Sequence, residues 1–377
     1  MIAPQRQRIS AGISGAVAFS ALFVASTLGC GPRPASPAAA PAAPERIAIV
    51  AAERGPRGPR LVAIDEHGDR RFELLVPPAA GIVRDVNPAI SPDGRWLVFA
   101  STRGRRFDET SLWLAPLAAG ATPIRLTEGA WIDSHPAWTR DGGAIVFAST
   151  RDGGDFDLWR VPVAAGRAAG PPVQLTSAPS HEVTPAVASG GAIVYAAVTP
   201  LVGSSPLRGT EVESHLEERA PDGAIRRVTE GPGDASPAIS PDGATIVFAR
   251  PVLHGATPDS ELWRLAAGGG EAAVLVDLPL TEESGPVWSP DGRYVFATSV
   301  LRKADGGPLF SSVVHVDLQE RPPRARMLRD RAGAIARLTP AVATPRLDAP
   351  ALRGGPEYLP ELSRILAAAI AEASRRP

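Results

Sequence analysis

Short apolar runs that end in an aromatic residue recur along the chain at nearly constant spacing. The closing aromatic residues are Phe99, Phe147, Tyr195, Phe248 and Phe296. They lie 48, 48, 53 and 48 positions apart. A proline, three residues and a Pro-Asp-Gly, Arg-Asp-Gly or Ser-Gly-Gly turn precede each run. Apolar runs this short, bounded by Gly and Asp, predict β-strands rather than helices.

Each repeat contains four strand-like segments. In the second copy these segments are residues 136–138, 144–147, 157–161 and 172–176, separated by Gly- and Asp-rich turns. A period in the 40s with four short strands per unit is typical of one blade of a β-propeller. The sequence therefore predicts an all-β protein in which the repeats form a ring.

The two ends of the repeat array complement each other. Residues 46–50, 60–64 and 72–75 match the second, third and fourth strands of a repeat, without a first. Residues 340–343 match a first strand with nothing after it. We expect the ends to pair in one composite blade, because closure removes the unpaired edges of an open array. This predicts a six-bladed β-propeller over residues 45–345.

The last segment, residues 346–377, has a different pattern. After a linker, residues 359–375 place apolar side chains at helical spacing. The sequence predicts an amphipathic helix, which either packs on the propeller or docks a partner.

The first 44 residues resemble an export signal followed by a tether. Arg6 and Arg8 precede an uncharged apolar stretch that ends just before Cys30, the one cysteine in the chain. This layout resembles a bacterial lipoprotein signal over residues 1–29, with lipidation of Cys30 and a Pro/Ala-rich tether over residues 30–44. A signal anchor or plain secretion are the alternatives. Gly31 stands where an Asp would favour inner-membrane retention, so we expect an outer-membrane protein facing the periplasm or the cell surface.

Charge and composition exclude several functions. The chain has 40 acidic and 39 basic residues, so no net field favours nucleic acid. Its six histidines form no helical metal-binding pattern, and the mature part has no Gly-x-Ser-x-Gly nucleophile motif. We therefore expect no cofactor, no metal and no catalytic residues.

The repeat motifs resemble one known family. The Ser-Pro-Asp-Gly turns, the Leu-Trp strands such as 112–113, and the Leu-Thr strands such as 126–127 are similar to the WD40-like repeats of the TolB type. The resemblance covers residues 46–344. It implies a six-bladed propeller in an exported protein that binds other envelope proteins.

An acidic residue stands three positions before each repeat proline. These residues are Asp85, Asp133, Glu182, Asp234 and Glu283. In a closed ring they predict an acidic channel mouth that binds a protein or peptide with a basic contact surface. Alternatively, each acid bonds within its own loop or pairs with Arg103, Arg151 or Arg250.

Two histidines lie in the same loops as these acids. His135 and His181 add specificity if the mouth is a binding site. They also leave open an envelope lyase or hydrolase, with or without a metal. The sequence favours a non-enzymatic, lipid-anchored binding propeller of the cell envelope.

Overall fold

The computed structural model describes the repeat region with short gaps. The described residues are 47–55, 58–65, 71–78, 81–106, 108–200, 212–254, 257–278, 281–302, 308–329 and 339–343, together with positions 364, 367 and 371.

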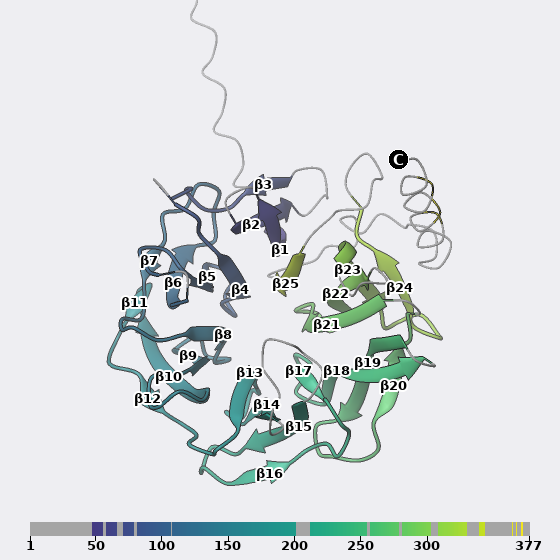
Figure 1. Ribbon diagram of the computed structural model, residues 1–377. Helices are drawn as coiled ribbons and strands as arrows, with labels where there is room; N and C mark the ends of the chain where they lie inside the picture. Colours follow the sequence, from purple (N-terminus) through teal and green to yellow (C-terminus); the bar gives the residue numbers. More distant parts are fainter. Residues whose placement is uncertain are drawn as a thin grey trace, which may run out of the picture. The chain divides into compact units, whose positions relative to one another are not determined.

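The strands pair in chain order as antiparallel sheets around a common centre (Figure 1). One sheet contains β4 (Asp85–Ile90), β5 (Trp96–Ser101), β6 (Ser111–Pro116) and β7 (Ile124–Arg125). The next contains β8 (Asp133–Trp138), β9 (Ala144–Ser149), β10 (Asp157–Ala164), β11 (Arg167–Ala168) and β12 (Val173–Gln174). The third contains β13 (His181–Val187), β14 (Ile193–Pro200), β15 (Val212–Arg219) and β16 (Ile225–Arg227).

An eight-stranded sheet consists of two successive groups of four. The first group is β17 (Ala235–Ile239), β18 (Thr245–His254), β19 (Thr257–Ala266) and β20 (Ala273–Val276). The second is β21 (Thr281–Trp288), β22 (Tyr294–Arg302), β23 (Pro308–Asp317) and β24 (Arg324–Met327). One parallel bridge between Ser260 and Glu282 joins the groups, so each group corresponds to one repeat.

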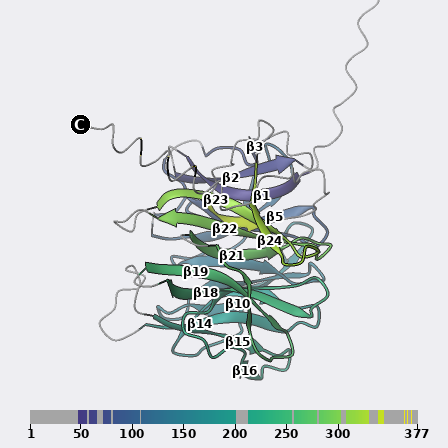
Figure 2. The same ribbon diagram turned by 90° about the vertical axis from the view of Figure 1, so that its right-hand side faces the viewer.

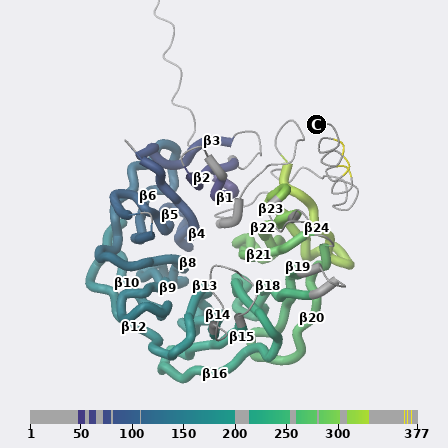
Figure 3. Tube along the Cα trace, in the orientation of Figure 1, coloured from purple at the N-terminus to yellow at the C-terminus, as the bar shows by residue number. Residues whose placement is uncertain are grey.

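The remaining sheet combines both ends of the repeat array. Its order is β25 (Thr339–Ala343), β1 (Ile47–Gly55), β2 (Gly58–Asp65) and β3 (Arg71–Glu73). Val50 pairs with Ala343 and Ala51 with Val342. The predicted pairing of the two ends is therefore present. Figure 3 follows the chain around the ring from purple at β1 to yellow-green at β24.

The hydrophobic core lies between neighbouring sheets. The second strand of each repeat is buried on both faces, because alternate residues point to opposite neighbours. Leu97 and Phe99 pack against the composite sheet, whereas Val98 and Ala100 pack against the sheet of β8–β12. Comparable clusters join every successive pair of four-stranded groups in the described residues. Figure 2 shows β22 and β23 beside β1 and β2, where one of these clusters closes the ring.

Hydrogen bonds within each Asp-Gly turn stabilise the turn. Asp93 accepts hydrogen bonds from the Ser91 hydroxyl and the Arg95 amide, and the turns at Asp141, Asp242 and Asp291 repeat this pattern. The hydroxyl donors hold the pKa of Asp93, Asp141 and Asp242 below the usual range. The turn glycines have φ of 71–75°, a conformation that strongly favours glycine. These aspartates are therefore turn residues rather than site residues.

Several predicted features lie outside the described residues. They include the signal peptide, Cys30, the tether, and the C-terminal linker and helix apart from three isolated helical positions. Within the part of the chain that the structure describes, no helix has the length and apolarity needed to cross a membrane.

Candidate functional site

The innermost strand of each repeat carries a β-bulge beside its proline. The pairing register shifts at the same point in β4, β8, β13, β17 and β21. The residue before each proline adopts a left-handed backbone conformation, with φ of 48–58°. We call these five the rim residues: Asn87, His135, Thr184, Ser236 and Gly285. Four of the five are not glycine, and such strain is concentrated at functional sites.

The rim residues and their prolines line an axial channel. Five buried prolines form a ring that two chambers share, namely Pro88, Pro136, Pro185, Pro237 and Pro286. The rim chamber, on the side of the rim residues, has a volume of about 320 Å³. The turn chamber, on the side of the Asp-Gly turns, has a volume of about 460 Å³. The channel is therefore lined by uncharged, rigid side chains where the two chambers meet.

The rim chamber is polar and uncharged near neutral pH. Burial lowers the pKa of His135 to about 4, so its imidazole is neutral. Its Nδ1 lies 2.9 Å from the Ser134 hydroxyl. The Thr184 hydroxyl is buried and has no hydrogen-bond partner among the described residues. These groups offer a bound chain hydrogen bonds without a fixed charge.

Most of the side chains that line the turn chamber are apolar. Trp138 and Trp288 line it, and each indole Nε1 donates to a carbonyl oxygen of a preceding repeat, Ala89 or Ala238, at 3.1 Å. Arg140 also lines this chamber. Its side chain is exposed, and it stands in its turn where three other repeats have proline.

The predicted acidic mouth is not formed. Asp85, Asp133, Glu182, Asp234 and Glu283 are only 0–3% exposed, and none of them lines either chamber. Each carboxylate accepts hydrogen bonds inside the protein, from side-chain hydroxyls, from a guanidinium or from both. The alternative interpretation of these residues, as structural acids, agrees with the geometry.

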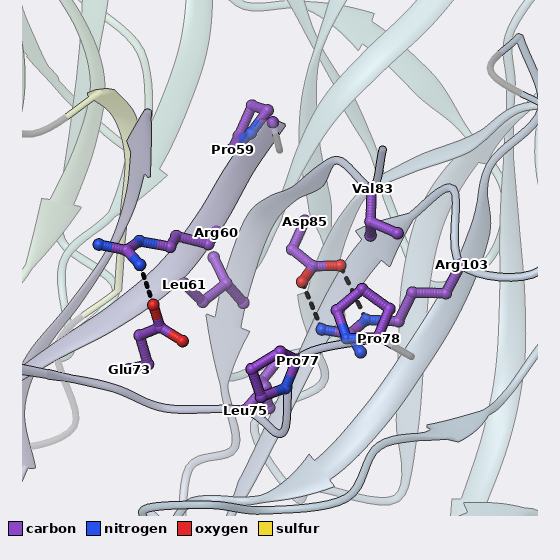
Figure 4. Close-up of a pocket in the computed structure, with 11 residues that line it drawn as sticks. Pro59, Arg60, Leu61, Glu73, Leu75, Pro77, Pro78, Val83, Asp85 and Arg103 are labelled. Atoms are coloured by element: carbon purple, nitrogen blue, oxygen red, sulfur yellow. Dashed lines mark hydrogen bonds and ion pairs between the residues drawn. The ribbon is translucent and has the colours of Figure 1, made fainter. Parts of the chain in front are cut away.

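Three of the acids pair with arginine. Arg103 donates to Asp85 through Nε at 3.0 Å and through Nη2 at 2.6 Å. Figure 4 shows the two side chains facing each other at a small pocket of about 100 Å³ between β2 and β4. Arg151 and Arg250 bind Asp133 and Asp234 in the equivalent places. Their charges are therefore neutralised inside the protein.

Aromatic side chains surround two of these arginines. The Arg151 guanidinium lies 4.9–5.2 Å from the ring centres of Trp131, Phe147 and Trp159. Arg250 lies 4.4 Å from the ring centre of Trp263. Cation–π contacts of this kind favour a desolvated guanidinium, so the buried pairs are structural units of the blades.

The two glutamates have no arginine partner in the described residues. Glu283 accepts hydrogen bonds from the hydroxyls of Thr281 and Ser299. Glu182 accepts one from Ser180, and the Asp157 carboxyl lies close to it. Burial raises the pKa of Glu182 to about 7 and raises that of Glu283 well above its usual value. These carboxyls therefore bind a proton more readily than an exposed carboxylate does, at positions where the aspartates pair with a guanidinium.

The two histidines have different surroundings. His135 lines the rim chamber, but His181 lines neither chamber. The Nδ1 of His181 accepts a hydrogen bond from the Phe156 amide at 3.1 Å, and its ring packs edge-on against Phe156. Among the described residues, no three His, Cys, Asp or Glu side chains form a group able to hold a metal. The structure therefore does not combine the histidines into one reactive set.

The rim conformation and Arg140 were not anticipated from the sequence. The residue before a proline is normally pushed to an extended conformation, so a left-handed ring has no simple sequence signal. Arg140 did have one, because it replaces the proline of the Ser-Pro-Asp-Gly pattern.

Several solved structures are similar to this fold. A putative TolB from Agrobacterium tumefaciens matches at 20% identity with a TM-score of 0.50, over 73% of this chain and 86% of that chain. TolB from Acinetobacter baumannii matches at 17% identity with a TM-score of 0.53, over 72% of this chain and 61% of that chain. A chain of a nidogen/laminin complex matches at 11% identity with a TM-score of 0.55, over 79% and 99% of the two chains. At these identities the likeness concerns the fold alone.

A family model gives the more specific result. No curated protein matches the chain. The model of the TolB beta propeller domain matches residues 81–290, which span more than half of the chain and contain β4 to the repeat proline Pro286. Together with the bulged repeats and the axial channel, this match places the chain in the TolB beta propeller domain family.

Proposed function

We propose that this chain is a non-enzymatic binding propeller of the bacterial cell envelope, and that it holds a protein or peptide segment at the rim chamber. The observation that carries the proposal is the ring of strained rim residues. Four residues other than glycine hold φ near 50° around one opening. Backbone strain of about 1–3 kcal/mol per residue is costly to keep where it serves only packing.

The lining of the chamber supports a peptide ligand. The side chains of Asn87 and Ser236 and the unpartnered hydroxyl of Thr184 offer donors and acceptors to a backbone. The proline ring below them offers a rigid apolar contact that loses little entropy on binding. The likeness to a chain of the nidogen/laminin complex is consistent with protein binding by such a fold.

Site-specific photocrosslinking tests the proposal in cells. A benzophenone amino acid replaces Asn87 or Ser236 at the rim, and Ile225 on the exposed outer strand β16 serves as the control. We expect a discrete crosslinked partner from the rim positions and none from position 225. Equal adducts from the rim and from the outer strand would contradict the proposal.

We further propose that the chain is exported and lipidated at Cys30, on the basis of the signal-like residues 1–29. The membrane contact is then made by the lipid, and residues 30–44 act as a spacer. Cys30→Ala should move the protein from the membrane fraction to the soluble fraction. Unchanged membrane retention would rule out the lipid anchor.

A further inference from the structure

Arg140 reaches from one blade to another at the turn-side end of the channel. It follows β8, and its Nη2 donates to the carbonyl oxygens of Ile239 and Ser240, at 3.2 and 3.3 Å. Those carbonyls end β17, and β13 lies between β8 and β17 in the ring (Figure 1). The guanidinium therefore lies across the end of the turn chamber.

The charge of Arg140 is not neutralised within the described residues. No carboxylate oxygen there lies within 4.0 Å of its guanidinium, and Nε and Nη1 make no hydrogen bond. The acids of the adjoining groove, Asp93 and Asp141, bond with their own turns. Among the described residues that line the two chambers, Arg140 carries the one full charge, because His135 is neutral.

The turn itself does not require an arginine. Pro92, Pro241 and Pro290 occupy the same position in three other repeats, and proline fixes the backbone angle that this turn position prefers. The backbone amide of Arg140 donates no hydrogen bond in the described residues. The presence of arginine at position 140 is therefore explained by its side chain and not by the backbone conformation of the turn.

We infer that the channel selects a peptide segment bearing a carboxylate, which Arg140 binds at the end of the turn chamber. This inference rests on the proposed function and reverses the ligand charge expected from the sequence. A guanidinium with free donors binds carboxylate through charge-assisted hydrogen bonds. The proline ring and the indoles of Trp138 and Trp288 provide the apolar walls for the rest of the segment.

The test uses a random hexapeptide library, prepared once with free and once with amidated C-termini. It is selected against the full chain and against Arg140→Pro and Arg140→Glu. Arg140→Pro restores the pattern of the other repeats, so thermal unfolding should show an intact fold.

We expect the wild-type protein to enrich either acidic side chains or free C-termini, and comparing the two libraries identifies the source of the carboxylate. The Kd of the best peptide should rise at least tenfold in Arg140→Pro, and Arg140→Glu should enrich lysine and arginine. The selected peptides are also tested for crosslinking to the rim positions 87 and 236. Peptides that crosslink there but show no charge preference would overturn this inference and leave the proposed function intact. A library that yields no ligand would overturn both.

Discussion

Arg250 binds the fully buried Asp234 with two hydrogen bonds, from Nε to Oδ1 at 2.6 Å and from Nη2 to Oδ2 at 2.8 Å. Asp234 directly precedes β17 and Arg250 lies in the neighbouring strand β18, and the indole of Trp263 covers the guanidinium. Removal of one partner leaves a buried charge without compensation.

Arg250→Ala should therefore destabilise the protein strongly, by roughly 3–5 kcal/mol. Urea unfolding followed by circular dichroism measures this free energy. The matched control is Arg106→Ala, because Arg106 and Asp108 form an ion pair with side chains more than 70% exposed. That change should cost about 0–1 kcal/mol. Similar losses of unfolding free energy in both variants would show that the buried ion pair stabilises the fold no more than the exposed pair does.

The raised pKa of Glu182 should make stability depend on pH. Its pKa rises from 4.5 to about 7 on folding, so the folded state binds more protons than the unfolded state between these values. The contribution of Glu182 to the free energy of unfolding is fully present below pH 4.5. It is lost as the pH rises through 7. In Glu182→Gln the urea midpoint should fall less between pH 5 and pH 8 than in the wild type. A constant difference between the two proteins across this range would contradict the assignment.

Relief of rim strain should stabilise the fold and impair binding. Thr184 is β-branched, has φ of 52° and buries an unpartnered hydroxyl. Thr184→Gly should raise stability by about 1 kcal/mol, and the partner crosslinked from Asn87 should be captured less well. Val173→Gly, at an exposed position of β12, should instead lower stability by about 0.5–1 kcal/mol. If Thr184→Gly destabilises as Val173→Gly does, the rim conformation is not strained.

Loss of β25 should open the ring. A chain that ends at residue 329 leaves one edge of β1 unpaired, and we expect a broad, low-temperature unfolding transition together with aggregation. A chain that ends at residue 345 keeps β25 and serves as the control. It should unfold cooperatively and close to the full chain. Cooperative unfolding of the shorter chain would show that β25 is dispensable.

The sequence predicted those parts of the fold that the repeat period determines. The spacing of Phe99 and Phe147 located the second strands, because residues buried on both faces must be apolar throughout. The proline at position 340 located the strand that pairs with β1. The positions of these strands follow from the pairing of backbones within each repeat, and the repeat length sets that pairing.

The charges of the site were not predictable in the same way. The sequence placed Asp85 and Asp133 in loops, whereas they begin strands β4 and β8. Spacing also does not determine which way a side chain points. The burial of these acids depends on Arg103 and Arg151, which follow the adjacent strand and fold back over it. The sequence left this pairing open as an alternative, and the distances decide in its favour.

The pairing of β1 with β25 also has a consequence for the time at which the fold can form. Ala52 pairs with Thr339, so nearly the whole propeller is synthesised between the two partners. At a usual translation rate that interval lasts roughly 15–60 s. Until the last strand emerges, the growing chain is an arc with two bare sheet edges, even if every earlier blade is complete. The pairing of β25 with β1 is therefore also the moment at which the chain loses its exposure to edge-to-edge aggregation.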